Sequence, residues 1–255
     1  MPFAKVNGIE IFYERLGPPT GTPLVLTHGF AGPSGHWKPE IESLAGKRPL
    51  VLYDVRGHGR TSVPPDPEAY SLPQFAVDYP ELCESVLLCD TTCGNGVDAG
   101  PAGDWERRMQ VGIGTLAHFV RTYGLEETVR REFEYGALND PHHAESPYPL
   151  EGDLRRIKMM TLEGYLGAAQ AMVTRPDLTD RIGAITAPAL VMIGEWDDFL
   201  PCAMRDHALI PGSRLVVRDR CGHGSRWRAD TFIAEVESFL ADVETGNPIA
   251  IERHV

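Results

Sequence analysis

Two stretches decide the fold of this chain: Pro23–Phe30, PLVLTHGF, and Pro49–Asp54, PLVLYD. Each is a short run of Leu and Val that ends at a polar or glycine turn, which is typical of a strand buried on both faces. Residues 36–45, between them, have a weak helical pattern. Two buried strands joined through a helix predict a parallel sheet covered by helices, because parallel neighbours need a crossover connection.

Further strands are predicted on both sides of this pair. Residues 3–16 alternate apolar and polar around Asn7-Gly8, the dipeptide that most strongly favours a hairpin. A helix is predicted to begin at Ser71 and to end at Pro80. The tail 244–255 is predicted to be a surface appendage. Other buried strands are predicted at 85–90, 188–194 and 213–218, and helices at 201–210 and 229–243.

Residues 93–182 interrupt the alternation of strands and helices. The stretch Cys93–Asp104, CGNGVDAGPAGD, is rich in glycine and changes the composition. After it the pattern is helical, with helices predicted at 105–123, 125–137 and 152–174. We therefore expect an α/β core built from residues 1–92 and 183–255, with a helical cap at residues 93–182.

The composition excludes several classes of partner. The formal net charge of -12 argues against nucleic acid and against an anionic membrane, since both need a basic surface. No apolar run approaches the ~20 residues of a membrane span, and the N-terminus has no signal pattern. The five cysteines lack the spacing of a disulfide or metal framework, and His142-His143 lack a third ligand. We expect a cytoplasmic protein with a small-molecule substrate or ligand, no metal and no cofactor.

Four strand ends carry polar motifs, and in open α/β sheets the working residues lie at the carboxyl ends of the strands. The motifs are THGF (27–30), DVRGHGRTS (54–62), GEWDDFLP (194–201) and CGHG (221–224). In this order and spacing they resemble the α/β-hydrolase fold family, in particular its 3-oxoadipate enol-lactonase and esterase branch. The resemblance covers nearly the whole chain and implies a doubly wound, mainly parallel sheet with a helical cap insertion.

The resemblance also implies roles for individual residues. His223 matches the base, since a neutral imidazole accepts a proton near neutral pH. Asp197 matches the acid that orients the base, although Asp197 and its neighbour Asp198 are both alternatives as caps of the next helix. The backbone N–H of Phe30, after Gly29, matches an oxyanion-hole donor. The resemblance further implies that His28 and the loop 56–60 brace the fold.

The nucleophile of this family lies in a Gly-x-Ser-x-Gly turn between a strand and a helix, and the sequence has no such motif. Residues 75–78, FAVD, run directly into YPELCESVLLCD, so about 25–35 residues of the family pattern are absent. In the family, the strand that leads to the nucleophile lies beside the strand that corresponds to 23–28. Because that strand is absent here, we expect the strand 85–90 to take its position. Asp90 or Cys93 then becomes a candidate nucleophile near His223, the alternative being a turn cap and a loop residue.

These features predict a hydrolase of small carboxylic esters or lactones, with a substitute nucleophile or with water activated by His223 and Asp197. Three alternatives remain. The first is an inactive or ligand-binding protein on the same scaffold, and the second is a deletion variant of an ordinary hydrolase. The third is a lyase or decarboxylase that needs no nucleophile. The loss of a covering helix also predicts a homodimer that covers the exposed surface.

Overall fold

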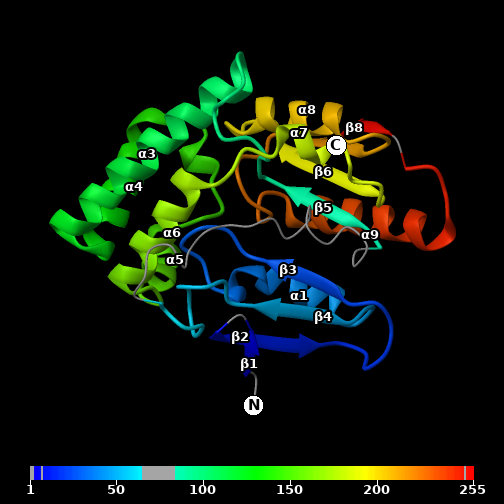
Figure 1. Cartoon of the computed structure of the whole chain (residues 1–255), viewed down its shortest axis with the longest axis horizontal. Coiled ribbons are helices and arrows are strands. Elements are labelled where there is room, and N and C mark those ends of the chain that lie inside the picture. The colour runs from blue at the N-terminus through cyan, green and yellow to red at the C-terminus, as the bar shows by residue number, and fades with distance from the viewer. Residues whose placement is uncertain (1–2, 7, 65–83, 250) are drawn as a thin grey trace. The chain divides into compact units, whose positions relative to one another are not determined.

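The computed structural model describes residues 3–6, 8–64, 84–249 and 251–255. The chain divides into two compact units, coloured by residue number in Figure 1. The first contains residues 1–71 and 112–174, and the second contains residues 72–111 and 175–255. The division into a core (1–92 and 183–255) and a cap (93–182) stays a prediction.

The first unit holds a four-stranded sheet in the order β1-β2-β4-β3. β1 (Phe3–Val6) and β2 (Ile9–Leu16) are antiparallel, which confirms the hairpin, and Gly8 takes the positive φ of 79° that the turn needs. β3 (Leu24–Thr27) and β4 (Leu50–Tyr53) are parallel, as predicted. Between them lie η1 (Ser34–Trp37) and α1 (Lys38–Leu44).

Burial of β3 is less complete than predicted. Val25 is 53% exposed, whereas Leu26 is buried. Among the strands that the structure describes, β3 forms a ladder only with β4. Since side chains of a strand point to the two faces of the sheet, the exposed Val25 shows that the prediction of burial on both faces is wrong for β3.

Helices complete the first unit. They are the second half of α3 (Pro101–Tyr123), α4 (Leu125–Asn139), η4 (His143–Glu145), α5 (Leu150–Ile157) and α6 (Leu162–Thr174). The single helix predicted at 152–174 is wrong, because the chain forms α5 and α6 there. Thr161 Oγ1 accepts a hydrogen bond from Gly164 N at 3.0 Å, so Thr161 caps a new helix after Ile157.

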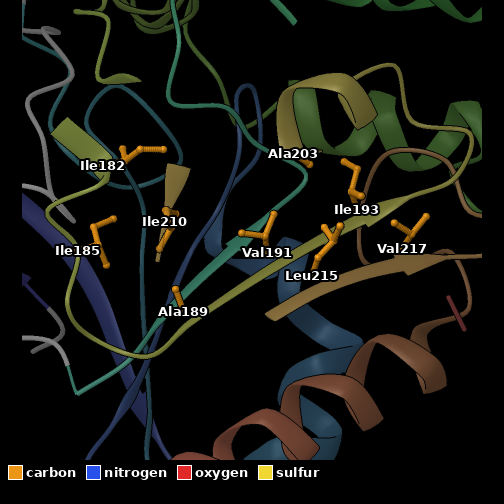
Figure 2. Packing of buried hydrophobic residues seen from close by; sticks show 9 residues of the cluster. All are labelled: Ile182, Ile185, Ala189, Val191, Ile193, Ala203, Ile210, Leu215 and Val217. Atoms are coloured by element: carbon orange, nitrogen blue, oxygen red, sulfur yellow. The ribbon is translucent and has the colours of Figure 1, made fainter. Parts of the chain in front are cut away.

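The second unit holds a fully parallel sheet in the order β5-β6-β7-β8. Its strands are β5 (Val86–Cys89), β6 (Ala189–Gly194), β7 (Arg214–Arg218) and β8 (Glu252–His254), with α7 (Thr179–Ile182), α8 (Leu200–Leu209) and α9 (Ala229–Thr245). The strands and helices predicted from residue 85 to 90 and from 188 to 243 are therefore confirmed. Figure 2 shows the apolar core of this unit, in which Val191 and Ile193 of β6 share a cluster with Leu215 and Val217 of β7.

The C-terminal tail corrects the prediction of a surface appendage. Leu215 N donates to Ile251 O at 3.0 Å and Val255 N donates to Val217 O at 3.1 Å, so the tail adds β8 to the edge of the sheet. Its short polar sequence hides this pairing, because backbone groups provide it.

Some predictions fall outside the described residues. These are the helix predicted to begin at Ser71 and the junction at residues 75–81. The prediction that strand 85–90 lies beside strand 23–28 relates two different units and stays a prediction. None of the helices in the described ranges is long and apolar enough to cross a membrane.

Candidate functional site

The structure brings together His223 and Asp197, the predicted base and acid, in the second unit. Asp197 follows the end of β6, and His223 lies in the loop after β7. Nδ1 of His223 and Oδ2 of Asp197 are 2.9 Å apart. The carboxylate is buried, with 1% of its side chain exposed, whereas 59% of the His223 side chain is exposed. No described residue hydrogen-bonds to Nε2 of His223, so that nitrogen is open to a substrate or to water.

The local fold places this pair through close backbone packing. A Cβ atom at Gly194 would lie 2.3 Å from Cys221 O, so only glycine lets the end of β6 approach the loop before His223. Trp196 N donates to Cys221 O at 2.8 Å and joins the same two segments. Oδ1 of Asp197 accepts a hydrogen bond from Phe199 N at 2.9 Å, so Asp197 also organises the turn into α8.

The electrostatic surroundings favour a charged ring at His223. Packing among protein atoms opposes the charge, but the hydrogen bond to Asp197 and the charges of Asp197 and Asp90 outweigh it and raise the pKa of His223 to about 9. The pair therefore holds an imidazolium at neutral pH, and the neutral base form grows as the pH rises toward 9.

Asp90 lies beside this pair, at the end of β5. Its Oδ2 accepts a hydrogen bond from Gly224 N at 3.1 Å, and Arg218 Nη2 lies 3.6 Å away. Only 7% of its side chain is exposed. Burial raises the pKa of Asp90 to about 6, against the lowering effect of the charges on His223 and Arg218. A carboxylate this enclosed is poorly placed to attack a substrate.

Cys93 is held elsewhere in the same unit. Its Sγ lies 3.0 Å from Oδ1 of Asp206, and its backbone N donates to Oδ2 of Asp206 at 2.9 Å. Burial and the charge of Asp206 raise the pKa of the Cys93 thiol far above its usual range. These surroundings disfavour the thiolate that nucleophilic attack requires.

The predicted oxyanion donors Phe30 and Gly29 lie after β3 in the first unit. No described residue accepts a hydrogen bond from the backbone N–H of Phe30, which therefore remains available as a donor. Val55 N donates to Nε2 of His28 at 2.8 Å, so His28 carries its proton on Nδ1, 2.8 Å from Gly29 O. Ala31 N donates to Nε2 of His58 at 3.1 Å. The two histidines thus brace the loop that carries Phe30.

Asp54 also anchors this part of the first unit through hydrogen bonds to backbone N–H groups. Its carboxylate is fully buried and accepts hydrogen bonds from Ser34 N at 2.7 Å and Arg60 N at 2.9 Å. A Cβ atom at Gly59 would lie 2.3 Å from Oδ2 of Asp54, so glycine is required there. The bracing role that the resemblance implied for His28 and the loop 56–60 is confirmed by these contacts.

The site contains residues that the sequence did not single out. Arg218, on β7, contacts Asp90 and the loop that follows His223. The sequence feature that could have identified it is a charged residue inside an apolar strand. Arg205, on α8, binds Asp206 at 2.9 Å and Glu106 at 2.8 Å and so fixes the surroundings of Cys93. Within the described ranges, no group of three or more His, Cys, Asp or Glu side chains could hold a metal ion.

Comparison with known proteins assigns the architecture. A family model described as the alpha/beta hydrolase fold matches residues 22–86. The crystal structure of an enol-lactonase from Burkholderia xenovorans superposes with a TM-score of 0.72 at 22% identity, covering 94% of this chain and 100% of that one. The chain has the α/β-hydrolase fold. This agrees with the fold implied by the four strand-end motifs.

Proteins of similar sequence differ in their named activities. A Bacillus subtilis protein named "Putative 2-succinyl-6-hydroxy-2,4-cyclohexadiene-1-carboxylate synthase" is 28% identical over 85% of this chain and 89% of its own length. The protein named "Probable oxidoreductase EphD" of Mycobacterium tuberculosis is 30% identical over 53% of this chain. That match spans only 23% of the mycobacterial protein. The α/β-hydrolase fold therefore does not by itself assign one reaction.

Proposed function

We propose that the chain is a hydrolase of small carboxylic esters or lactones, with His223 as the base and Asp197 as the acid that orients it. The observation that carries the proposal is the 2.9 Å contact between His223 Nδ1 and a buried carboxylate, with Nε2 left open. A buried carboxylate that fixes the ring through Nδ1 is the arrangement that lets Nε2 accept a proton.

The attacking group in this proposal is water. The enclosed carboxylate of Asp90 and the thiol of Cys93 are both disfavoured as nucleophiles by their surroundings. Nε2 of neutral His223 removes a proton from water as the oxygen attacks the carbonyl carbon. The tetrahedral intermediate then collapses, and the imidazolium returns the proton to the leaving alkoxide. A donor to the oxyanion is required as well, and the role implied for the backbone N–H of Phe30 stays a prediction.

The test is hydrolysis of p-nitrophenyl acetate and of small lactones, with a serine-directed phosphonate as a probe for a covalent nucleophile. Turnover without labelling, lost in His223→Gln and kept in His118→Gln, supports the proposal. His118 is a suitable control because it is an exposed histidine on α3. Equal turnover in His223→Gln and the unsubstituted chain contradicts the proposal.

A second candidate is a lyase or decarboxylase in which His223 transfers a proton without any nucleophile. The Bacillus subtilis relative supports this second candidate, since its name as a synthase denotes a reaction other than ester hydrolysis. Proton exchange at carbon in a keto acid or ester, dependent on His223 and without ester cleavage, identifies this class. The absence of both activities identifies a ligand-binding or inactive protein, including a deletion variant. The homodimer also stays a prediction, to be tested by mass in solution.

A further inference from the structure

Arg218 is a fully buried arginine at the end of β7, five residues before His223. Its Nη1 donates to Trp227 O at 2.7 Å, and its Nη2 donates to Gly224 O at 3.2 Å. The same Nη2 lies 3.6 Å from Oδ2 of Asp90. One guanidinium thus contacts both ends of the loop 224–227, which continues directly from His223.

Asp90 holds the same loop from the neighbouring side. Its Oδ2 accepts a hydrogen bond from Gly224 N, so Gly224 is bound through its N–H by Asp90 and through its carbonyl by Arg218. Asp90 itself adopts a φ of 49°, a left-handed conformation that is uncommon for a residue other than glycine.

The pair is an inefficient way to stabilise a fold. Nε of Arg218 and Oδ1 of Asp90 are buried and have no hydrogen-bond partner among the described residues. Buried ion pairs with unsatisfied atoms often contribute less stability than apolar residues of the same size. A geometric role explains the pair better than a stabilising one.

We propose that Arg218 and Asp90 are positioning residues, which hold the loop 224–227 so that His223 meets Asp197 in the orientation for proton transfer. This inference rests on the proposed function of His223. The charged groups that act on His223 are Asp197 after β6, Asp90 after β5 and Arg218 on β7. They come from three strands, and only Asp197 touches the ring by a hydrogen bond.

Arg214 provides a matched control within the same strand. It is also fully buried, and it lies over the ring of Phe239 of α9 as Arg218 lies over the ring of Phe232. Its contacts are Asp242 and Ile249 O, away from the His223 loop. Any effect of losing a buried arginine from β7 should appear in both positions, whereas an effect on His223 should appear only at Arg218.

The experiment compares Arg218→Lys with Arg214→Lys. Lysine keeps the charge but cannot reproduce the planar fork that reaches Trp227 O and Gly224 O together. The imidazole Cε1–H resonance of His223 is followed by NMR over pH, assigned by its loss in His223→Gln, and kcat and KM are measured on p-nitrophenyl acetate. A loosened loop weakens the contact with Asp197, so Arg218→Lys should lower the pKa of His223 by about one unit. At pH 10, where the base is mostly neutral in both variants, it should also lower kcat about tenfold at nearly constant KM.

Asp90→Asn supplies a second measurement that does not depend on the folding of Arg218→Lys. Asparagine retains an acceptor for Gly224 N–H but removes the charge, so the pKa of His223 should fall while the fold is kept. Asp242→Asn, at the partner of Arg214, should leave that pKa unchanged. The proposal is overturned if Arg218→Lys and Asp90→Asn titrate His223 as the unsubstituted chain does, or if the two lysine variants behave alike. The NMR titration decides this even in a chain with no turnover, which would contradict only the proposed function.

Discussion

His28 and His58 in the first unit and His223 in the second all follow β-strands, yet their surroundings shift the pKa of the imidazole in opposite directions. His28 and His58 are buried and accept backbone N–H groups through Nε2. Burial lowers the pKa of His28 to about 4 and also lowers that of His58. His223 is more than half exposed and bound to a carboxylate, and its pKa is raised.

This difference identifies the histidine that can act as a general base. A ring whose Nε2 already accepts a backbone N–H has no lone pair left for a substrate proton. His28 and His58 are therefore structural groups that stay neutral. His223 keeps Nε2 open and has a carboxylate to stabilise its charged form, which suits a general base.

Replacing His223 should have the largest effect on activity. His223→Gln should lower kcat/KM for p-nitrophenyl acetate about 10³-fold, because positioned general bases contribute effects of this order. The melting temperature should fall at neutral pH, because the raised pKa of His223 means that its pairing with Asp197 stabilises the folded state there. A steady-state assay beside a thermal melt measures both. A His223→Gln variant that unfolds but retains its specific activity would place this residue with the structural histidines.

Substitutions of the neighbouring residues Asp197 and Asp198 should differ strongly in their effect on kcat. Asp197→Asn removes the negative charge that favours Nδ1–H of His223 and stabilises the imidazolium, and it should lower kcat about 10²-fold, since the acid of such a set contributes less than the base. Asp198→Asn should be close to neutral, because Asp198 is exposed and the hydrogen bond to His223 comes from Asp197. Matched kinetics of the two variants would show whether the acid is assigned correctly, and a larger loss in Asp198→Asn would reverse the assignment.

The pH dependence should follow the raised pKa of His223. The neutral base is the minor form at pH 7, so kcat/KM should rise about fiftyfold between pH 7 and 9 and then level off. Asp197→Asn should move this limb to lower pH, because it removes the group that favours the imidazolium. Initial rates across pH 5 to 10, limited to conditions where the fold is intact, measure the limb. A plateau already reached at pH 7 would contradict the raised pKa.

Replacing His58 should lower the stability of the fold and leave the rise of kcat/KM with pH unchanged. His58→Ala leaves the N–H of Ala31 without its acceptor, and Ala31 has a φ of 55°. An unsatisfied buried donor costs about 1–3 kcal/mol, which urea unfolding would register. His118→Ala should unfold as the unsubstituted chain does. If His58→Ala also matched the unsubstituted chain in stability, the bracing role of this histidine would be wrong.

The sequence was sufficient where the information is local. Asn7-Gly8 predicted the hairpin, and the Leu and Val runs at 23–28, 49–54 and 188–194 predicted strands, because turn chemistry and periodicity act over a few residues. His223 and Asp197 could be proposed because each follows a recognisable strand and glycine turn.

The remainder depends on contacts between distant residues. Asp90 binds Gly224 across 134 positions of sequence, and nothing near either residue encodes that hydrogen bond. The break between α5 and α6 was missed because Met159 and Met160 continue an apolar pattern while Thr161 caps a new helix. Arg218 left one usable signal, since an arginine within the apolar strand Arg214–Arg218 requires a buried partner.

The most direct test of the contrast is an NMR pH titration of the histidine Cε1–H resonances in the unsubstituted chain, with each assigned by single substitution. We expect His223 to titrate near pH 9, well above the ordinary value of 6.5, and His28 to remain neutral down to about pH 4. A His223 that titrates at or below 6.5 would contradict the claim that its carboxylate partners prepare it for proton transfer.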